Sequence, residues 1–181
     1  MVVRQSNVSS KLVARKRALV KKRPASAGSF SPPLRKVFSD LRSRSCFVKS
    51  NAIISLSKFG EKYEGVIRNQ FARSNPFVKE TILQVLFRIN PKKHSEFIAS
   101  NILHPAGNVA VQAISLSVDM KNRKVIPLLR MRALDKGASL NVRAMALRAL
   151  AEEFGVMDEE LHRALVEVRA RNPMASLNEL K

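Results

Sequence analysis

The residues in this sequence whose chemistry is most evident are its lysines and arginines. The chain of 181 residues carries 33 of them against 14 aspartates and glutamates, a formal net charge of +19 at pH 7. A surplus of this size attracts polyanions, because each phosphate that a cation neutralises releases a counterion. The composition therefore indicates nucleic acid as the first class of partner, with anionic membranes and acidic proteins behind it.

The candidate binding cations fall into two groups. One lies in residues 1–23, which include no acidic residue, and the other lies where we expect turns within helical pairs. A charged turn taken singly is usually just solvated, so the argument for a basic ridge is its recurrence at three aligned turns. The first group is Arg4, Lys11, Arg15, Lys16, Arg17, Lys21, Lys22 and Arg23; the second is Lys58, Lys62, Lys92, Lys93, Lys121, Arg123 and Lys124.

Residues that could carry catalysis or hold a metal form no recognisable constellation. His94, His104 and His162 lie far apart and lack ligand spacing, so we expect them in loops or on the surface. Cys46 is the only cysteine, which excludes an internal disulfide, and we expect it to be a small buried hydrophobe. The phosphate-loop pattern GxxxxGK is absent. We therefore expect no metal, no cofactor, no small-molecule substrate and no enzymatic activity.

Aromatic residues do not alternate with basic ones in the way that a base-stacking surface requires. Six phenylalanines fall at or beside positions that we expect in the core: Phe38, Phe47, Phe59, Phe77, Phe97 and Phe154. We therefore expect contacts with RNA to be made to phosphates, which position a nucleic acid without reading its sequence.

Residues 1–30 are predicted to be a basic, flexible N-terminal arm or presequence, with a linker at 24–31. Three interpretations stay open. A presequence is rich in arginine and serine and poor in acids, and it would direct the protein to the mitochondrial or another organellar matrix. A retained arm would reach into nucleic acid. A solvated tail would do neither and would leave a cytoplasmic or nuclear location.

Residues 31–44 are predicted to form a leading amphipathic helix. Ser31 is the expected N-cap, and the two prolines after it suit a first turn, where their missing N–H has no cost. The apolar stripe consists of Leu34, Val37, Phe38 and Leu41. No apolar run in the chain approaches the ~20 residues that cross a bilayer, so we expect no transmembrane segment.

An internal repeat organises the rest of the chain. Val48, Val78, Val109 and Val142 are spaced by 30, 31 and 33 residues, and each begins an apolar stripe at helical spacing. Apolar residues of a second helix follow in every unit: Val66 and Ile67, Phe97 and Ile98, Leu128 and Leu129, and Leu161. Hairpins of two helices therefore recur, and each can bury its apolar face only against its neighbours.

Polar and small residues punctuate this pattern. Caps at or near the start of each first helix are predicted at Ser45, Asn75, Asn108 and Asn141. The first helices are predicted to end near Gly60, Asn90 and Gly155.

The repeat resembles the HEAT-like (armadillo-type) family, in particular the pattern V-R-x-x-A-L-x-A-L-x-x-x-G. The best copy is 141–155 (NVRAMALRALAEEFG), and fair or looser copies begin at Phe47 and Phe77. The resemblance covers about 45–173 and implies an all-α fold, a short α-solenoid of about four helical hairpins preceded by the extra helix at 31–44. Residues 174–181 are left as a C-terminal tail.

The fourth unit differs, because acids replace cations at its turn: Glu152, Glu153, Asp158, Glu159 and Glu160. They either complement the dipole of the following helix or dock another molecule. Our leading hypothesis is a non-catalytic scaffold that binds RNA backbone and protein neighbours in a ribonucleoprotein assembly such as an organellar ribosome. The alternative is a protein–protein adaptor whose basic surface docks on an acidic partner.

Overall fold

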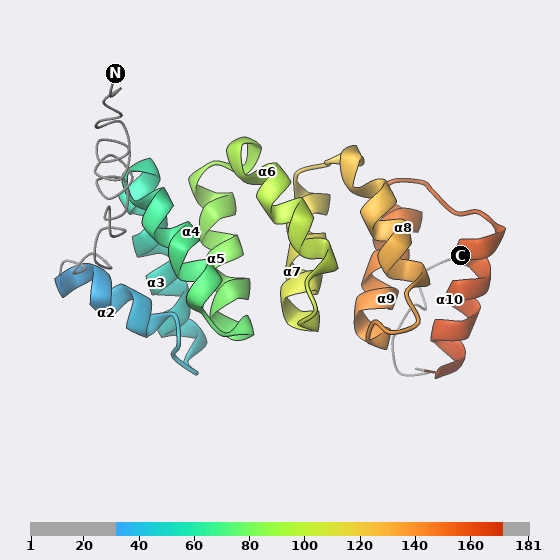
Figure 1. Cartoon of the computed structure of the whole chain (residues 1–181), viewed down its shortest axis with the longest axis horizontal. Helices are drawn as coiled ribbons and strands as arrows, with labels where there is room; N and C mark the ends of the chain where they lie inside the picture. Colours follow the sequence, from blue (N-terminus) through green and yellow to red (C-terminus); the bar gives the residue numbers. More distant parts are fainter. Residues whose placement is uncertain (1–31, 172–181) are drawn as a thin grey trace, which may run out of the picture. The chain divides into compact units, whose positions relative to one another are not determined.

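A computed structural model of the chain describes residues 32–171, and Figure 1 shows their arrangement. These residues form helices joined by short turns and contain no strand, which confirms the predicted all-α class. The candidate cations of residues 1–23, the linker, the cap at Ser31 and the tail at 174–181 lie outside the described residues. No helix in the described range is long and apolar enough to cross a membrane.

The chain divides into two compact units, Met1–Arg35 and Lys36–Lys181, and the packing below is that of the second. Helix α2, which crosses the boundary between the units, ends at Asp40, before the end of the predicted segment 31–44. The α-helices are α2 (Pro32–Asp40), α3 (Cys46–Phe59), α4 (Glu64–Arg73), α5 (Pro76–Ile89), α6 (Pro91–Ser100), α7 (Gly107–Asp119), α8 (Ile126–Leu134), α9 (Leu140–Arg148) and α10 (Glu159–Arg171). Short helical segments join several of them: η1 (Gly60–Tyr63), η2 (Asn101–Leu103), η3 (Arg123–Val125) and the π-helical η4 (Ala149–Glu153).

Helices α3 to α10 are arranged as consecutive pairs in two layers. The first members pack in succession, α3 on α5, α5 on α7 and α7 on α9. The second members lie against this row: α4 contacts α5, α6 contacts α5 and α7, α8 contacts α9, and α10 contacts α8 and α9. Each pair therefore depends on its neighbours for much of its packing.

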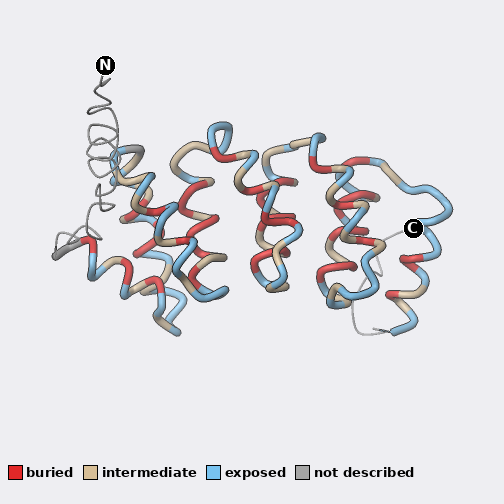
Figure 2. Tube along the Cα trace, in the orientation of Figure 1, coloured by how far each residue is buried: buried red, intermediate tan, exposed pale blue. Residues whose placement is uncertain are grey.

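The core lies between the two layers, where the buried faces of the helices meet (Figure 2). The apolar stripes of the first helices supply most of it, as their spacing predicts. The buried members are Ala52, Ile53 and Leu56; Val78, Ile82, Leu83 and Leu86; Val109, Ala113 and Ile114; and Val142, Ala146, Leu147 and Leu150. Each second helix adds a fully buried side chain, namely Ile67, Ile98, Leu129 or Leu161.

Three of the six phenylalanines expected at or beside the core are instead exposed. Phe47 and Phe77 are 75% and 45% exposed, and Phe59 is 36% exposed. Phe47 and Phe77 are the second residues of α3 and α5, and Phe59 is the last residue of α3. At helix ends the neighbouring helices give way to turns, so an apolar side chain there has less to pack against. Cys46, which begins α3, is exposed for the same reason, and the prediction that it is buried is wrong.

Two of the four predicted caps are confirmed. The side chains of Ser45 and Asn75 accept hydrogen bonds from the first turns of α3 and α5. Asn108 does not cap α7; its amide donates across to Glu80 and to the carbonyl of Pro76 in α5. Helix α9 begins two residues earlier than a cap at Asn141 would place it, with Ser139 as its cap.

A buried arginine joins the last three helices. The side chain of Arg143 in α9 is almost completely buried, and its Nε donates to the carbonyl of Ala133 in α8 at 3.1 Å. Its two Nη atoms donate to the carboxylate of Glu167 in α10 at 3.4 and 3.2 Å. These charge-assisted bonds hold the pKa of Glu167 below the ordinary value of a glutamate.

We predict that Leu147→Ala lowers the free energy of unfolding by about 2–5 kcal/mol, because it leaves a cavity in the core beside the C-terminal end of α9. Urea unfolding followed by circular dichroism measures the loss. The matched control is Val166→Ala on exposed α10 surface, which should cost less than about 0.5 kcal/mol. Equal effects of the two changes would contradict the assigned core.

We also predict that Glu167→Gln lowers the melting temperature at pH 7, because it leaves the buried charge of Arg143 without a counter-charge. The lowered pKa of Glu167 makes its pairing stabilising above the ordinary glutamate pKa of about 4.3, and this stability is lost as the pH falls further. The difference between the two proteins should therefore shrink in acid. Glu96→Gln, an exposed glutamate in α6, is the control and should change little at either pH.

Candidate nucleic-acid interface

The seven cations predicted to occupy turns all lie at turns within helical pairs, and all are exposed. We call these residues the basic turn column: Lys58 and Lys62 between α3 and α4, Lys92 and Lys93 after the end of α5, and Lys121, Arg123 and Lys124 between α7 and α8. Figure 1 shows that the three turns follow one another along one edge of the second unit. The structure thus brings together cations that lie up to 66 residues apart in the sequence, from 58 to 124.

In the second turn, one lysine of the column has a structural partner. Asn90 caps α6 by accepting a hydrogen bond from the backbone N–H of Lys93 at 3.1 Å. The Nζ of Lys93 lies 2.6 Å from a carboxylate oxygen of Glu64 in α4. The hydrogen bond from Lys93 lowers the pKa of Glu64, so this carboxylate stays charged and paired. Lys92, beside it, is exposed.

The third turn holds a lysine in an unfavourable backbone conformation. Lys121 has a φ of 50°, in the left-handed region, and its N–H donates to the carbonyl of Val118 at 2.7 Å. The N–H of Asn122 donates to the carbonyl of Ser117 at 3.1 Å, which completes a Schellman motif at the end of α7. Glycine is the usual residue at this place in the motif, because it has no Cβ to crowd the backbone.

The corresponding part of the sequence in two other units holds a glycine with positive φ. Gly60 and Lys121 each stand 12 residues after their anchors, Val48 and Val109, and Gly155 stands 13 after Val142. Gly60 and Gly155 also have positive φ, 61° and 66°. A lysine in this conformation costs roughly 1 kcal/mol more than a glycine would, and strain of this kind is often found at functional sites.

The fourth turn ends the column with acids that are mostly used within the fold. Arg130 of α8 forms ion pairs with Asp158 and with Glu160, the latter at 2.6 Å. Asp158 also accepts a hydrogen bond from the N–H of Leu161 at the start of α10, and Arg130 lowers the pKa of Asp158. Arg123 reaches this turn from the third one and donates to the carbonyl of Phe154 at 3.2 Å. This favours the stabilising explanation of the acidic turn over intermolecular docking.

An aromatic pair that sequence reasoning missed borders the first turn. The rings of Phe59 and Tyr63 lie edge to face, with centroids 5.4 Å apart and planes at 70°. The Nζ of Lys62 lies 5.7 Å from the centroid of the Tyr63 ring. The available signal was the spacing: two aromatic residues four apart, on either side of the glycine that ends α3.

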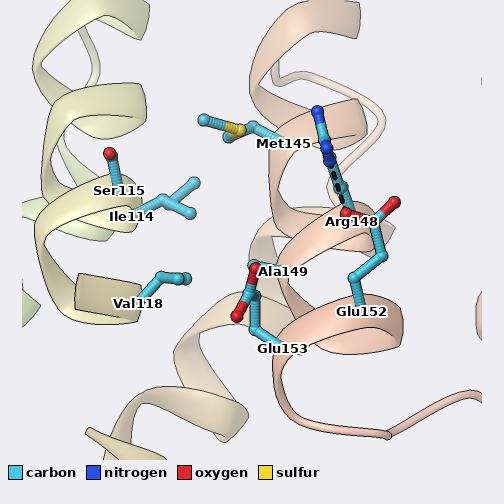
Figure 3. Close-up of a pocket in the computed structure, with 8 residues that line it drawn as sticks. All are labelled: Ile114, Ser115, Val118, Met145, Arg148, Ala149, Glu152 and Glu153. Carbon is cyan, nitrogen blue, oxygen red and sulfur yellow. Dashed lines mark hydrogen bonds and ion pairs between the residues drawn. The ribbon is translucent and has the colours of Figure 1, made fainter. Parts of the chain in front are cut away.

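A small pocket lies between α7 and the end of α9 (Figure 3). Its volume of about 160 Å³ is well below the ~300 Å³ at which small-molecule sites begin. Its lining combines Ile114, Ser115, Val118, Met145 and Ala149 with the charged Arg148, Glu152 and Glu153. Arg148 and Glu152 pair with each other at 2.5 Å, as Figure 3 shows, so these two charges are balanced within the fold.

The histidines and the cysteine do not come together within the described range. His94 is buried at the start of α6, so its expected position in a loop or on the surface is wrong. His104 is half-buried, and burial together with the nearby charge of Lys79 lowers its pKa. Among residues 32–171 no group of three or more potential metal-binding side chains is found.

Comparison with known proteins finds no match for this chain among protein-family models, curated proteins or solved structures. The interpretation of this edge as a candidate nucleic-acid interface therefore rests on its own geometry and charge.

We predict that Lys121→Gly raises the free energy of unfolding by about 0.5–1 kcal/mol, because glycine relieves the left-handed strain at a smaller entropic cost. Thermal or urea unfolding measures the gain. Lys121→Ala is the matched control, since it removes the same charge and keeps a Cβ, and it should give no such gain. A gain of the same size in both variants would mean that charge repulsion, and not backbone strain, is relieved.

Proposed function

We propose that this protein is a non-catalytic HEAT-like scaffold, a short α-solenoid of about four helical hairpins, that binds RNA backbone and protein neighbours in a ribonucleoprotein assembly. The observation that carries the proposal is the basic turn column, in which cations recur at three successive turns on one edge of the fold. An organellar ribosome is an assembly of the proposed kind.

The packing supports the repeat interpretation. Four pairs of helices follow one another within the described residues, and their first helices form a continuous row. The buried stripe positions fall at the same offsets from Val48, Val78, Val109 and Val142, although the side chain of Val48 itself is only half-buried. Such recurrence of one structural unit in register is what a solenoid requires.

The mechanism we propose is neutralisation of phosphates along the column. Neighbouring helices pack about 8–10 Å apart, so the three turns present separate cations along an extended line. Within the column Lys93 and Arg123 also stabilise the fold, through Glu64 and the carbonyl of Phe154. This leaves Lys58, Lys62, Lys92, Lys121 and Lys124 as the side chains best suited to contact a ligand.

The basic residues of 1–23 are included in the proposal as a second contact with RNA. If this segment is retained in the mature protein, its eight cations and lack of acids would add phosphate contacts and salt dependence. If it is a presequence, the column would act alone in the organellar matrix. The mass of the mature N-terminus from native material distinguishes the two cases.

We predict that replacing Lys62, Lys92, Lys121 and Lys124 together by glutamine weakens RNA binding by the full chain and flattens its salt dependence. The slope of log K against log salt should fall by roughly 2–3, since each lost phosphate contact removes about 0.7 for a single strand. Binding of labelled RNA at several salt concentrations, measured by fluorescence anisotropy, gives both quantities.

The matched control changes four exposed cations on the other edge of the fold, in the turn before α3, at the end of α4 and between α8 and α9: Arg42, Arg44, Arg73 and Lys136 to glutamine. Both variants lose the same net charge. If RNA binding depended on net charge alone, both would lose the same affinity for RNA, and that result would contradict the proposed role of the basic turn column. A different outcome would identify an adaptor. In that case neither the parent nor either variant binds RNA, the parent binds an acidic protein, and the column variant does not bind that protein.

A further inference from the structure

The aromatic pair at the first turn consists of an exposed phenylalanine, Phe59, and a half-buried tyrosine, Tyr63. Phe59 closes α3 and keeps 36% of its surface in solvent, although its side chain is large and apolar. In an edge-to-face pair, one ring contributes only its edge, so its two faces are not used by its partner. Rings arranged in this way can still accept a flat ligand.

The space beside the pair is open. Gly60 separates the two rings in sequence, and a Cβ built on it would meet no atom within 4 Å. Its positive φ directs the chain sharply from α3 into η1, which carries Tyr63 back toward Phe59. Apart from its two chain neighbours, Gly60 therefore has open space on the side where a side chain would project.

Cations border the pair on both sides. Lys58 precedes Phe59 and is exposed, and Lys62 lies over the ring of Tyr63 with its Nζ 5.7 Å from the centroid. Glu64, which follows Tyr63, is paired with Lys93 at 2.6 Å, so its charge is already balanced. Aromatic faces beside a line of lysines are the combination with which proteins hold single-stranded nucleic acid.

We propose that Phe59 and Tyr63 form a base-stacking platform at the first turn of the basic turn column, and that its ligand is single-stranded RNA. This inference rests on the proposed function and narrows its ligand from RNA in general to single-stranded RNA. Phosphate contacts alone would accept a duplex as readily as a single strand, whereas the platform needs an unpaired base. The sequence-based expectation of contacts to phosphates alone is then incomplete at this turn.

The sequence supplies a probe for the platform without any mutation. Tyr63 is the only tyrosine, and the chain has no tryptophan, so the tyrosine fluorescence of the full chain comes from this site. A base stacked on the pair should quench that fluorescence. The ligand is an oligouridine of about 12 nucleotides, within the length that single-stranded sites span. Duplex RNA of the same length and inorganic polyphosphate provide the same kind of charge without unpaired bases.

We expect oligouridine to quench Tyr63 and polyphosphate and duplex RNA to bind with little quenching. Phe59→Leu should weaken oligouridine binding about fivefold or more while leaving polyphosphate binding unchanged. Phe47→Leu is the matched control, since it removes an even more exposed phenylalanine from the opposite end of the same helix, and it should leave both affinities unchanged.

Two results would overturn the platform while leaving the column intact. One is oligouridine binding, seen by anisotropy, without a change in Tyr63 fluorescence. The other is equal quenching by oligouridine and polyphosphate, which would report charge and not stacking. Failure of every nucleic acid and of polyphosphate to bind would instead overturn the proposed function itself. Circular dichroism of Phe59→Leu checks that the variant keeps the helical content of the parent.

Discussion

The arrangement of this protein depends on the burial of one apolar stripe per first helix against the helices before and after it. A hairpin of two short helices has too little apolar surface to hold itself together, so α3, α5, α7 and α9 must pack in a row. Once they do, the direction of each helix is fixed, and every turn within a pair falls on the same edge. Cations that are remote in the sequence meet there because of core packing, without any direct attraction between them.

The requirements of packing and of charge meet at the position that ends each first helix. A chain that leaves a helix through positive φ is best served by glycine, and Gly60 and Gly155 take this conformation without crowding from a Cβ. Lys121 occupies the corresponding place between Arg123 and the end of α7 and bears the strain. A lysine there adds charge to the edge at the expense of stability, which is a pattern expected where a surface is used for binding. The phenylalanine before Gly60 is exposed for a related reason, since the same turn removes the neighbours that would cover it.

Periodicity in the sequence predicted the helices and their buried faces because those features follow from spacing alone. The stripes that begin at Val78 and Val142 are buried almost throughout, and Ser45 and Asn75 cap the helices that they were expected to cap. Errors are concentrated at helix ends, where a residue's fate depends on neighbours from other units. Asn108 bonds to the preceding helix instead of its own first turn, and Phe47 and Phe77 extend past their core neighbours into solvent. The pattern of residues in one sequence does not specify which helix ends are covered by neighbouring helices.

The same limit of prediction from sequence applies to the charged residues of the candidate site. The sequence identified the turns that carry lysines, but it could not distinguish cations committed to the fold from those left for a ligand. Lys93 is paired with Glu64, and Arg123 reaches the carbonyl of Phe154 in the next turn, 31 residues on. Both partners lie in other hairpins, so only the packed structure reveals them. The two ends of this edge differ: the first turn has the Phe59–Tyr63 pair flanked by lysines, and the fourth turn has acids, two of which, Asp158 and Glu160, pair with Arg130. If the proposed function is right, a nucleic-acid strand lying along this edge would meet different chemistry at its two ends, and this difference would orient it.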